Sequence, residues 1–289
     1  MEEATLGVIG GSGVYDLEVL QDLQEVRITT PFGDPSDALV IGTLSGLRVA
    51  FLPRHGRGHR IMPSELNSRA NIYALKSIGV KYVVSISACG SMREDYAPRD
   101  IVIPDQIFDR TKGRVNSFFG NGLVVHVSFD EPYCADLSEL VYEAVKKTGA
   151  TVHRGGTLLV IDGPQFSTKA ESRIYRQWGV DLIGMTALPE AKLVREAEMC
   201  YASIAHVTDY DVWHETEQPV TVAMLIENLL ANAALTKEAL THLAPMLAQK
   251  GLRACRCGSA LETAIITQRD RIPEGVRRDL ALLLDKYLC

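Results

Sequence analysis

The feature that most constrains the fold is a set of short apolar runs, rich in β-branched residues and separated by amphipathic segments. The runs cover residues 6–9, 38–41, 49–53, 82–87, 101–103, 156–161, 181–185 and 201–207. Continuous apolar runs of this length are typical of strands buried on both faces of a parallel or mixed sheet. The alternation therefore predicts an α/β fold in which helices cover such a sheet in three layers.

The segments between the runs have the spacing of amphipathic helices. We expect helices that begin near Ser64 and Asp136 and end at Gly79 and Gly149, since a polar residue caps a helix start and glycine closes a helix end. Further helices are expected over residues 168–179, 187–199, 220–249 and 273–288. No internal repeat or low-complexity linker divides the 289 residues. We therefore expect a single domain over residues 1–289, with a helical tail from about residue 250.

Composition and charge exclude several classes of protein. The chain is 46% hydrophobic and 23% charged, as in globular proteins, and has no apolar run long enough to cross a membrane. The N-terminus carries two glutamates and lacks the basic region of a secretory signal, so we expect a cytoplasmic protein. The net charge of −6 argues against a nucleic-acid partner. A bound anion must therefore be held by local groups.

The first apolar run leads into the glycine-rich stretch IGGSG. A dinucleotide-binding fingerprint needs a spacing that Gly7, Gly10, Gly11 and Gly13 do not provide, and a Walker A loop needs a lysine that is absent. A nucleotide-dependent oxidoreductase is therefore disfavoured. Two interpretations remain open on these residues alone: a plain turn, or a loop whose backbone N–H groups and Ser12 hydroxyl hold a small anion.

Two other runs end in groups suited to an anion. The run 49–53 is followed by PRHGRGHR, where Arg54 and His55 offer donors for phosphate, although a solvated basic loop is the commoner interpretation of such a cluster. The run 82–87 ends in SISACGS, where Ser87 and Ala88 are small enough for a ligand to approach the backbone. We interpret Cys89 as a buried thiol, because no histidine is adjacent to activate it.

The last apolar run ends in HVTDYDVW. Asp209 and Asp211 are two residues apart, so in an extended chain both carboxylates face one side. Each raises the proton affinity of the other, and one could then act as a general acid. A helix-capping turn and a D-x-D metal site are the alternatives. After the run 181–185, Thr186 could donate to an anion, and Met185 could form an apolar wall or simply pack in the core.

Several blocks occur in one order over residues 6–249: IGGSG, TPFGDPSDAL, RHGRGHRIMPSELNSRANIYALK, ACGSMRED, DIVIPDQIFDRT, IDGPQFSTKAES and GMTALPEAKLVREAEMCYASIAHVTDYD. Together they resemble the methylthioadenosine phosphorylases of the trimeric purine nucleoside phosphorylase family. The resemblance implies a three-layer α/β/α fold with a central mixed, partly barrel-like sheet. It implies phosphorolysis of 5′-methylthioadenosine to adenine and 5-methylthioribose 1-phosphate, in purine and methionine salvage. Methylthioinosine or general purine nucleoside phosphorolysis is the alternative, and a purine- or phosphate-binding sensor is the non-enzymatic rival.

The resemblance also implies roles for particular residues. Asp209 and Asp211 would be catalytic, at the N7 and 6-amino edge of adenine, because a carboxylate suits a 6-amino donor. The phosphate would be bound by Ser12, Arg54, His55, Ser87, Ala88 and Thr186. The nucleoside would be bound by His59, Phe166, Ile183, Met185, Thr208, Val222 and Leu225, with His126 supplied by the neighbouring subunit. The chain would be a homotrimer or a dimer of trimers, with phosphate as co-substrate and no cofactor or metal.

The tail departs from this pattern at Cys255-Arg256-Cys257. A zinc site is one interpretation of the C-x-C, but its partner ligands are not evident from the sequence. A disulfide is another, with Cys134 and Cys200 as a second pair, and free thiols are the third. The three alternatives stay open, and we assign no metal.

Overall fold

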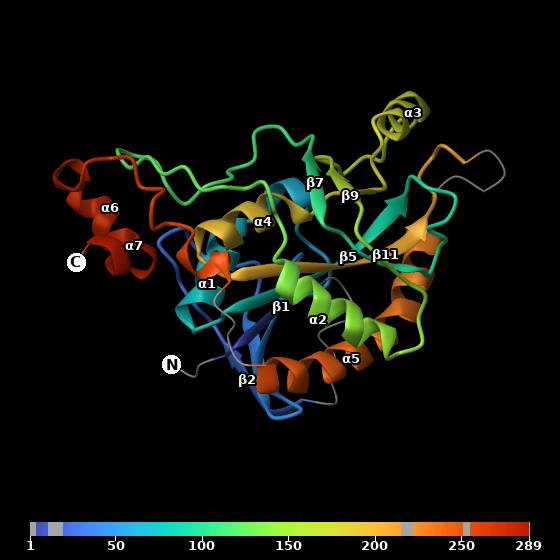
Figure 1. Cartoon of the computed structure of the whole chain (residues 1–289), viewed down its shortest axis with the longest axis horizontal. Helices are drawn as coiled ribbons and strands as arrows, with labels where there is room; N and C mark the ends of the chain where they lie inside the picture. The colour runs from blue at the N-terminus through green and yellow to red at the C-terminus, as the bar shows by residue number, and fades with distance from the viewer. Residues whose placement is uncertain (1–3, 11–19, 215–221, 251–254, 289) are drawn as a thin grey trace.

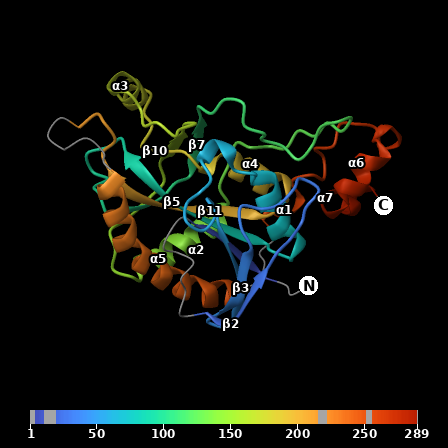
Figure 2. The same cartoon turned by 180° about the vertical axis from the view of Figure 1, so that it is seen from behind.

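The computed structural model describes residues 4–10, 20–214, 222–250 and 255–288, with the backbone alone for residues 222–231 and 250. Helices lie on both faces of a central sheet (Figures 1 and 2). The strands are β1 (Leu6–Gly10), β2 (Gln21–Val26), β3 (Leu39–Leu44), β4 (Leu47–Pro53), β5 (Tyr82–Ser91), β6 (Ile101–Ile103), β7 (Gln106–Asp109), β8 (Val152–Arg154), β9 (Thr157–Val160), β10 (Leu182–Gly184) and β11 (Cys200–Asp209). The helices are α1 (Ser68–Ser77), α2 (Ala135–Lys146), α3 (Lys169–Gln177), α4 (Ala187–Glu196), α5 (Val222–Lys250), α6 (Glu274–Asp279) and α7 (Ala281–Leu288).

The sheet is mixed, as the sequence predicts. Its main path runs β2-β3-β4-β1-β5-β10-β9-β7, and β11 pairs with β5 and with β6, which in turn pairs with β8. At the centre, β5 runs parallel to β1 and β11 and antiparallel to β10. Because β5 and β11 are parallel, their carboxyl ends meet at one edge of the sheet, where ligands usually bind in α/β proteins.

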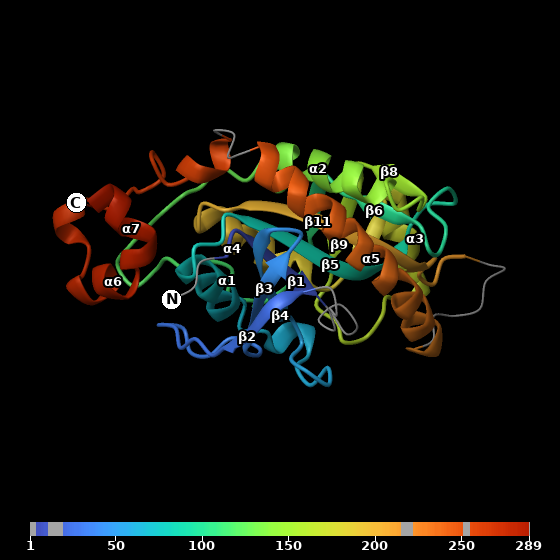
Figure 3. The same cartoon turned by 90° about the horizontal axis from the view of Figure 1, so that it is seen from below.

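Two apolar cores lie on the two faces of the sheet. Along β11, Tyr201 and Ala205 pack in the core shared with α1 and α4, while Ala202 and Ile204 pack in the core shared with α2 and α5. This alternation is the period of two that a strand imposes on its side chains. Both faces of β11 are therefore buried, and the three layers α2/α5, sheet and α1/α4 follow (Figure 3).

All the predicted strands are present, but three others are not among the predictions. The β2 sequence QDLQEV is polar and mostly exposed, β7 (QIFD) is mostly exposed, and β8 is only a short half-buried strand. A short or exposed strand needs no apolar run, because backbone hydrogen bonds to a neighbouring strand are enough to hold it. The apolar pattern of the sequence therefore finds the centre of the sheet and misses its periphery.

The helices are also where the sequence places them, with corrections at their ends. Helix α1 starts later than predicted: Asn67, not Ser64, caps it by accepting a hydrogen bond from the backbone of Ala70. The N-cap of α2 is Cys134 rather than Asp136, which puts a thiol at the start of that helix. The predicted tail helix is divided into α6 and α7 at Leu280. Among the described residues, no helix is both long and apolar enough to span a membrane.

Candidate active site

A cavity of about 260 Å³ opens at the carboxyl ends of β5 and β11. It brings together side chains that the sequence predicts from five separate stretches of the chain. The predicted site residues that line it are Arg54, His55, His59, Ser87, Ala88, Phe166, Ile183, Met185, Thr186, Thr208, Asp209 and Asp211. One cavity therefore contains hydrogen-bond donors suited to a phosphate, an apolar wall and two carboxylates.

The other predicted site residues are not seen in this cavity. Ser12 lies outside the described residues. Val222 and Leu225 lie in the first turns of α5, where only the backbone is described, although Ala233 further along that helix lines the cavity. His126 is exposed on the surface, and its backbone N–H donates to Ala264 O at 2.9 Å.

Arg54 forms a buried ion pair with Glu190 at the floor of the cavity. Its Nε donates to Glu190 Oε2 at 3.0 Å, and the two side chains are only 2% and 5% exposed. Further bonds go to Ile86 O at 2.9 Å and Ser85 Oγ at 2.7 Å. Tyr201 completes the group by donating from its hydroxyl to Glu190 Oε1 at 2.8 Å. The pair therefore joins β4, β5, β11 and α4.

These hydrogen bonds limit the number of N–H donors that Arg54 has left for a phosphate. A guanidinium has five N–H donors. The bonds to Glu190, the strand carbonyls and Ser85 leave one Nη1 N–H without a partner among the described residues. The negative charge of Glu190 also offsets the positive charge of Arg54. Sequence reasoning did not assign Glu190 a role, because nothing near it in the chain indicates a partner 136 positions away.

His55 is held as a neutral ring beside Arg54. Its Nδ1 lies 2.8 Å from Ile61 O, so Nδ1 carries the proton and donates. Burial, and then the positive charge of Arg54, lower its pKa to about 4. His59 stacks on it with ring centroids 4.4 Å apart. The Nε2 atom of His55 is therefore an acceptor at neutral pH.

Two hydroxyl groups stand opposite each other where β5 meets α4. Ser87 Oγ and Thr186 Oγ1 lie 3.2 Å apart. Thr186 is the N-cap of α4, but its side chain does not bond to the backbone of that helix. Both hydroxyls can turn toward a ligand. Leu188 has extended backbone angles (φ −119°, ψ 140°), so the regular part of α4 begins only after it, and Thr186 itself does not stand at the N-terminus of that regular helix.

Asp209 and Asp211 sit together in the cavity, and each is only 8% exposed. Asp209 Oδ1 accepts the backbone N–H of Asp211 at 2.7 Å, and its Oδ2 lies 2.7 Å from Thr208 Oγ1. Asp211 accepts from Ser172 Oγ at 2.6 Å. The sequence reasoning assumed a straight extended chain, whereas β11 has a register shift at Thr208 and Asp211 has a φ of 51°. The bulge and turn, rather than simple alternation, direct both side chains inward.

Burial raises the pKa of both carboxyl groups. For Asp209, desolvation outweighs the hydrogen bonds from Thr208 and Asp211, and the charge of Asp211 raises the pKa further. For Asp211, desolvation outweighs the bond from Ser172. When Asp209 is protonated on Oδ2, the same contact is satisfied with Asp209 donating to Thr208, whose hydroxyl then donates to Cys89 O at 3.2 Å. The network thus accommodates either protonation state.

Two glycines allow the walls of the cavity to approach each other. A Cβ at Gly90 would lie 2.9 Å from Asp209 Oδ1 and 3.0 Å from Ile183, so a side chain here would displace the carboxylate. At Gly163, which has a φ of 64°, a Cβ would collide with the sulfur of Met185. Arg114 then fixes this wall by donating to Met185 O at 2.7 Å and to Asp162 O at 2.7 Å.

The cavity also contains polar residues to which the sequence reasoning gave no role. Ser167 is buried, and its hydroxyl has no partner among the described residues. His206 Nε2 lies 2.7 Å from Thr236 Oγ1, and burial lowers the pKa of His206 to about 4. His206 is part of the HVTDYD motif and could have been considered. Ser167 and Thr236 carry no local signal that separates them from other hydroxyl residues.

Away from this cavity, the structure supplies the partners that the C-x-C motif lacked in the sequence. The sulfur atoms of Cys134, Cys200, Cys255 and Cys257 all lie within 4.8 Å of one another. None of the described cysteines forms a disulfide bond. Hydrogen bonds from Cys200 and Cys257 lower the pKa of the Cys134 thiol to about 2, and the same contacts raise the pKa of Cys200. The four thiols are therefore close enough together to hold a metal ion, a possibility that the sequence left open.

Comparison with known proteins gives the class first. Residues 5–244 match the model of the phosphorylase superfamily, so the chain belongs to that superfamily. The S-methyl-5′-thioadenosine phosphorylase of Chloroflexus aurantiacus is 55% identical over 288 residues, which cover 99% of each chain. The chain belongs to the family of S-methyl-5′-thioadenosine phosphorylases within this superfamily.

Solved structures agree with this assignment. A methylthioadenosine phosphorylase from an Antarctic soil metagenomic library is 44% identical, with a TM-score of 0.94 over 98% of this chain and 100% of the other. The methylthioadenosine phosphorylase from Schistosoma mansoni, solved in complex with adenine, is 33% identical, with a TM-score of 0.83 over 98% of each chain. The described fold is therefore that of the family throughout the chain.

We predict that Glu190→Gln destabilises the protein by about 3–5 kcal/mol, because it leaves the buried charge of Arg54 unpaired. Chemical denaturation of the wild type and the variant measures the change. The matched control is Glu25→Gln, which breaks the exposed pair with Arg57 (55% and 46% exposed) and should cost less than about 1 kcal/mol. Equal effects of the two substitutions would show that the buried pair has no special structural role.

Proposed function

We propose that the cavity catalyses the phosphorolysis of 5′-methylthioadenosine. An oxygen of inorganic phosphate attacks C1′ of the ribose, the C1′–N9 bond breaks, and adenine and 5-methylthioribose 1-phosphate leave. The observation that carries this proposal is the joint burial of two carboxylates and a hydroxyl-lined anion site in one cavity, in a chain of this family. Methylthioinosine or general purine nucleoside phosphorolysis, the alternative from the sequence, is not favoured by these relatives.

The spacing of these two groups along β5 suits a nucleoside and a phosphate. Ser87 belongs to the proposed phosphate site, and Gly90 pairs with Asp209 on β11, with Asp211 so near that a Cβ on Gly90 would lie 3.3 Å from it. At ~3.3 Å per residue, the two positions lie roughly 10 Å apart along the strand. A ribose fits between them, with the purine toward the carboxylates and phosphate toward Ser87.

In the proposed mechanism, Asp209 is the acid that makes adenine a good leaving group. Adenine leaves poorly as an anion, whereas a proton given to N7 lets it leave neutral. The raised pKa keeps a proton on Asp209 to higher pH than an exposed aspartate would, and Thr208 holds that proton until the purine binds. Asp211, fixed by Ser172, accepts the 6-amino group.

Phosphate acts as both nucleophile and countercharge in this proposal. The ribose becomes cationic as the bond to adenine stretches, and the phosphate below C1′ stabilises that charge before it attacks. The donors are the hydroxyls of Ser87 and Thr186 and the remaining N–H of Arg54. The neutral His55 fits a monohydrogen phosphate, because its Nε2 can accept the P–O–H proton.

We predict that Asp209→Asn lowers kcat by at least ~10², because the amide cannot protonate N7. Release of adenine from 5′-methylthioadenosine in the presence of phosphate measures this. In the wild type, kcat should fall as pH rises through the raised pKa of Asp209, because the protonated form is then lost. Asp270→Asn, at a tail position with 76% exposure, is the control and should leave kcat unchanged. Wild-type turnover by Asp209→Asn would exclude Asp209 as the acid.

We further predict a preference for 6-aminopurines over 6-oxopurines. Asp211 presents an acceptor to the 6-position of the purine, and an acceptor that faces a 6-oxo group lacks the hydrogen bond that a 6-amino group supplies. Phosphorolysis of 5′-methylthioadenosine and inosine, measured in parallel at equal concentrations, tests this. Equal or faster turnover of inosine would replace the proposal with the general purine nucleoside phosphorylase alternative.

We also propose that the chain is a homotrimer in the cytoplasm, or a dimer of such trimers, in which His126 completes the site of a neighbouring subunit. Two observations support this: His126 is exposed, and it does not line the cavity of its own chain. Light scattering should give at least three times the chain mass of 31.7 kDa, and His126→Ala should raise KM for the nucleoside without changing that mass. A fully active monomer would contradict the proposal, and cell fractionation tests the location.

A further inference from the structure

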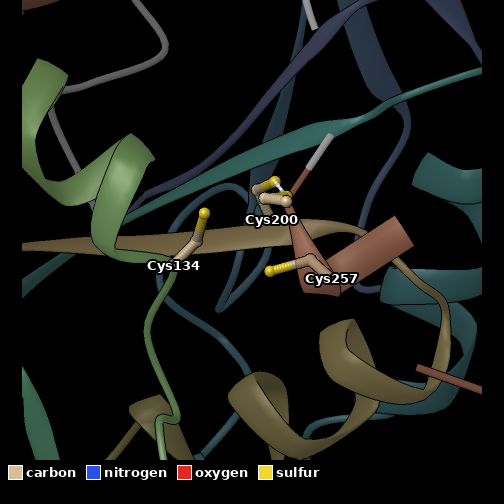
Figure 4. Close-up of side chains that lie close together, drawn as sticks. Cys134, Cys200 and Cys257 are labelled. Atoms are coloured by element: carbon tan, nitrogen blue, oxygen red, sulfur yellow. Dashed lines mark hydrogen bonds between the residues drawn. The ribbon is translucent and has the colours of Figure 1, made fainter. Parts of the chain in front are cut away.

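Four cysteines from three distant parts of the chain converge on one point. Cys134 is the N-cap of α2, Cys200 is the first residue of β11, and Cys255 and Cys257 flank one residue of the tail. The close-up in Figure 4 shows the side chains of Cys134, Cys200 and Cys257 turned toward one another. The cluster uses no residue of the cavity at the ends of β5 and β11.

The distances between the sulfur atoms match a shared ion better than two separate disulfides. In a disulfide, two sulfur atoms are bonded at ~2.05 Å, and the bond gives no reason for a second pair of cysteines to lie close by. A tetrahedral zinc ion with Zn–S bonds of ~2.3 Å holds four sulfurs about 3.8 Å apart. Here the pair Cys200 and Cys255 is 3.2 Å apart, and all four sulfurs lie within 4.8 Å of one another. Small rotations of the side chains would complete a tetrahedron.

The surroundings also suit a buried tetrathiolate. Cys134, Cys200 and Cys257 are buried, and Cys255 is half-buried, so the cluster lies close to the surface and an ion can enter. The N-terminus of α2 favours negative charge at Cys134. Four thiolates with no oxygen or nitrogen donor among them are ligands typical of a structural zinc site.

We propose that Cys134, Cys200, Cys255 and Cys257 bind one structural Zn²⁺ ion. On binding, four S–H bonds break, four Zn–S bonds form and four protons pass to solvent. All four positions of a tetrahedral ion are then filled by protein, so the ion has no place for substrate or water and its role is structural.

The positions of the four ligands indicate that the proposed ion would link the tail to the rest of the domain. Cys255 and Cys257 lie at the start of the tail. Cys134 and Cys200, in contrast, lie at the start of α2 and of β11 in the central fold. The tail is also held by apolar packing, since Leu280, Leu283 and Leu284 belong to one of the two cores, and by polar contacts. Glu198 accepts from Leu261 N at 2.9 Å and from Lys286 Nζ at 3.2 Å. A zinc ion adds four covalent-like bonds to these contacts, at the start of the tail.

The test measures metal on the full chain, without a histidine tag, purified under reducing conditions in metal-free buffer. Elemental analysis should find about one zinc ion per chain, with iron at background level. Replacement by Co²⁺ should give the visible absorption bands of tetrahedral cobalt bound to thiolates. Because the cobalt spectrum is recorded on the wild type, it is informative even where a cysteine variant does not fold.

The variants Cys257→Ser and Cys255→Ser should contain at least tenfold less zinc than the wild type. Cys89→Ser is the matched control, since Cys89 is a buried cysteine outside the cluster, and its zinc content should equal that of the wild type. Folded wild-type protein that stays metal-free after anaerobic incubation with Zn²⁺ would overturn the proposal. So would stoichiometric iron, intramolecular disulfides among these four cysteines in the protein as isolated from cells, or an equal loss of zinc in Cys89→Ser.

Discussion

The Arg54–Glu190 ion pair joins the end of β4 to the start of α4 in the middle of the molecule, and the walls of the cavity are arranged around it. Burying two charges costs several kcal/mol each, and the cost is recovered only where hydrogen bonds satisfy both groups. Here Ser85, Ile86 and Tyr201 supply those bonds. The strands that carry the proposed phosphate donors are therefore fixed in position before any ligand binds.

The same pair also determines the charge of the proposed phosphate site, in a chain whose net charge is −6. Glu190 neutralises Arg54, and the lowered pKa keeps His55 uncharged. In the proposed phosphate site, the attraction would then come from the hydroxyl groups of Ser87 and Thr186 and from backbone dipoles that are oriented in advance.

The sequence allowed the buried centre of the fold to be predicted, and the residues near each strand end with it. The apolar runs identified β5 and β11 as buried strands, and the polar residues after such runs identified much of the cavity, whereas the parallel pairing of the two strands is seen only in the structure. Contacts between residues far apart in the chain had no such signal. Glu190 became visible as the partner of Arg54 only in three dimensions, and Cys134 and Cys200 likewise became partners of Cys257. The exposed strand β2 was missed because its sequence is polar.

The strand-like contact between the tail and the segment around His126 has a consequence for the order of folding. Val125 bridges to Ile265, and Val124 accepts a hydrogen bond from the backbone of Ile266 (the tail lies beside this segment in Figures 1 and 2). During synthesis, residues 124–126 leave the ribosome well before their partners in the tail exist. Because chains begin to fold as they are made, this segment stays without its backbone partners in the tail until the tail has been translated. In the proposed trimer, where His126 would reach a neighbouring subunit, this surface would be complete only after the tail has been translated.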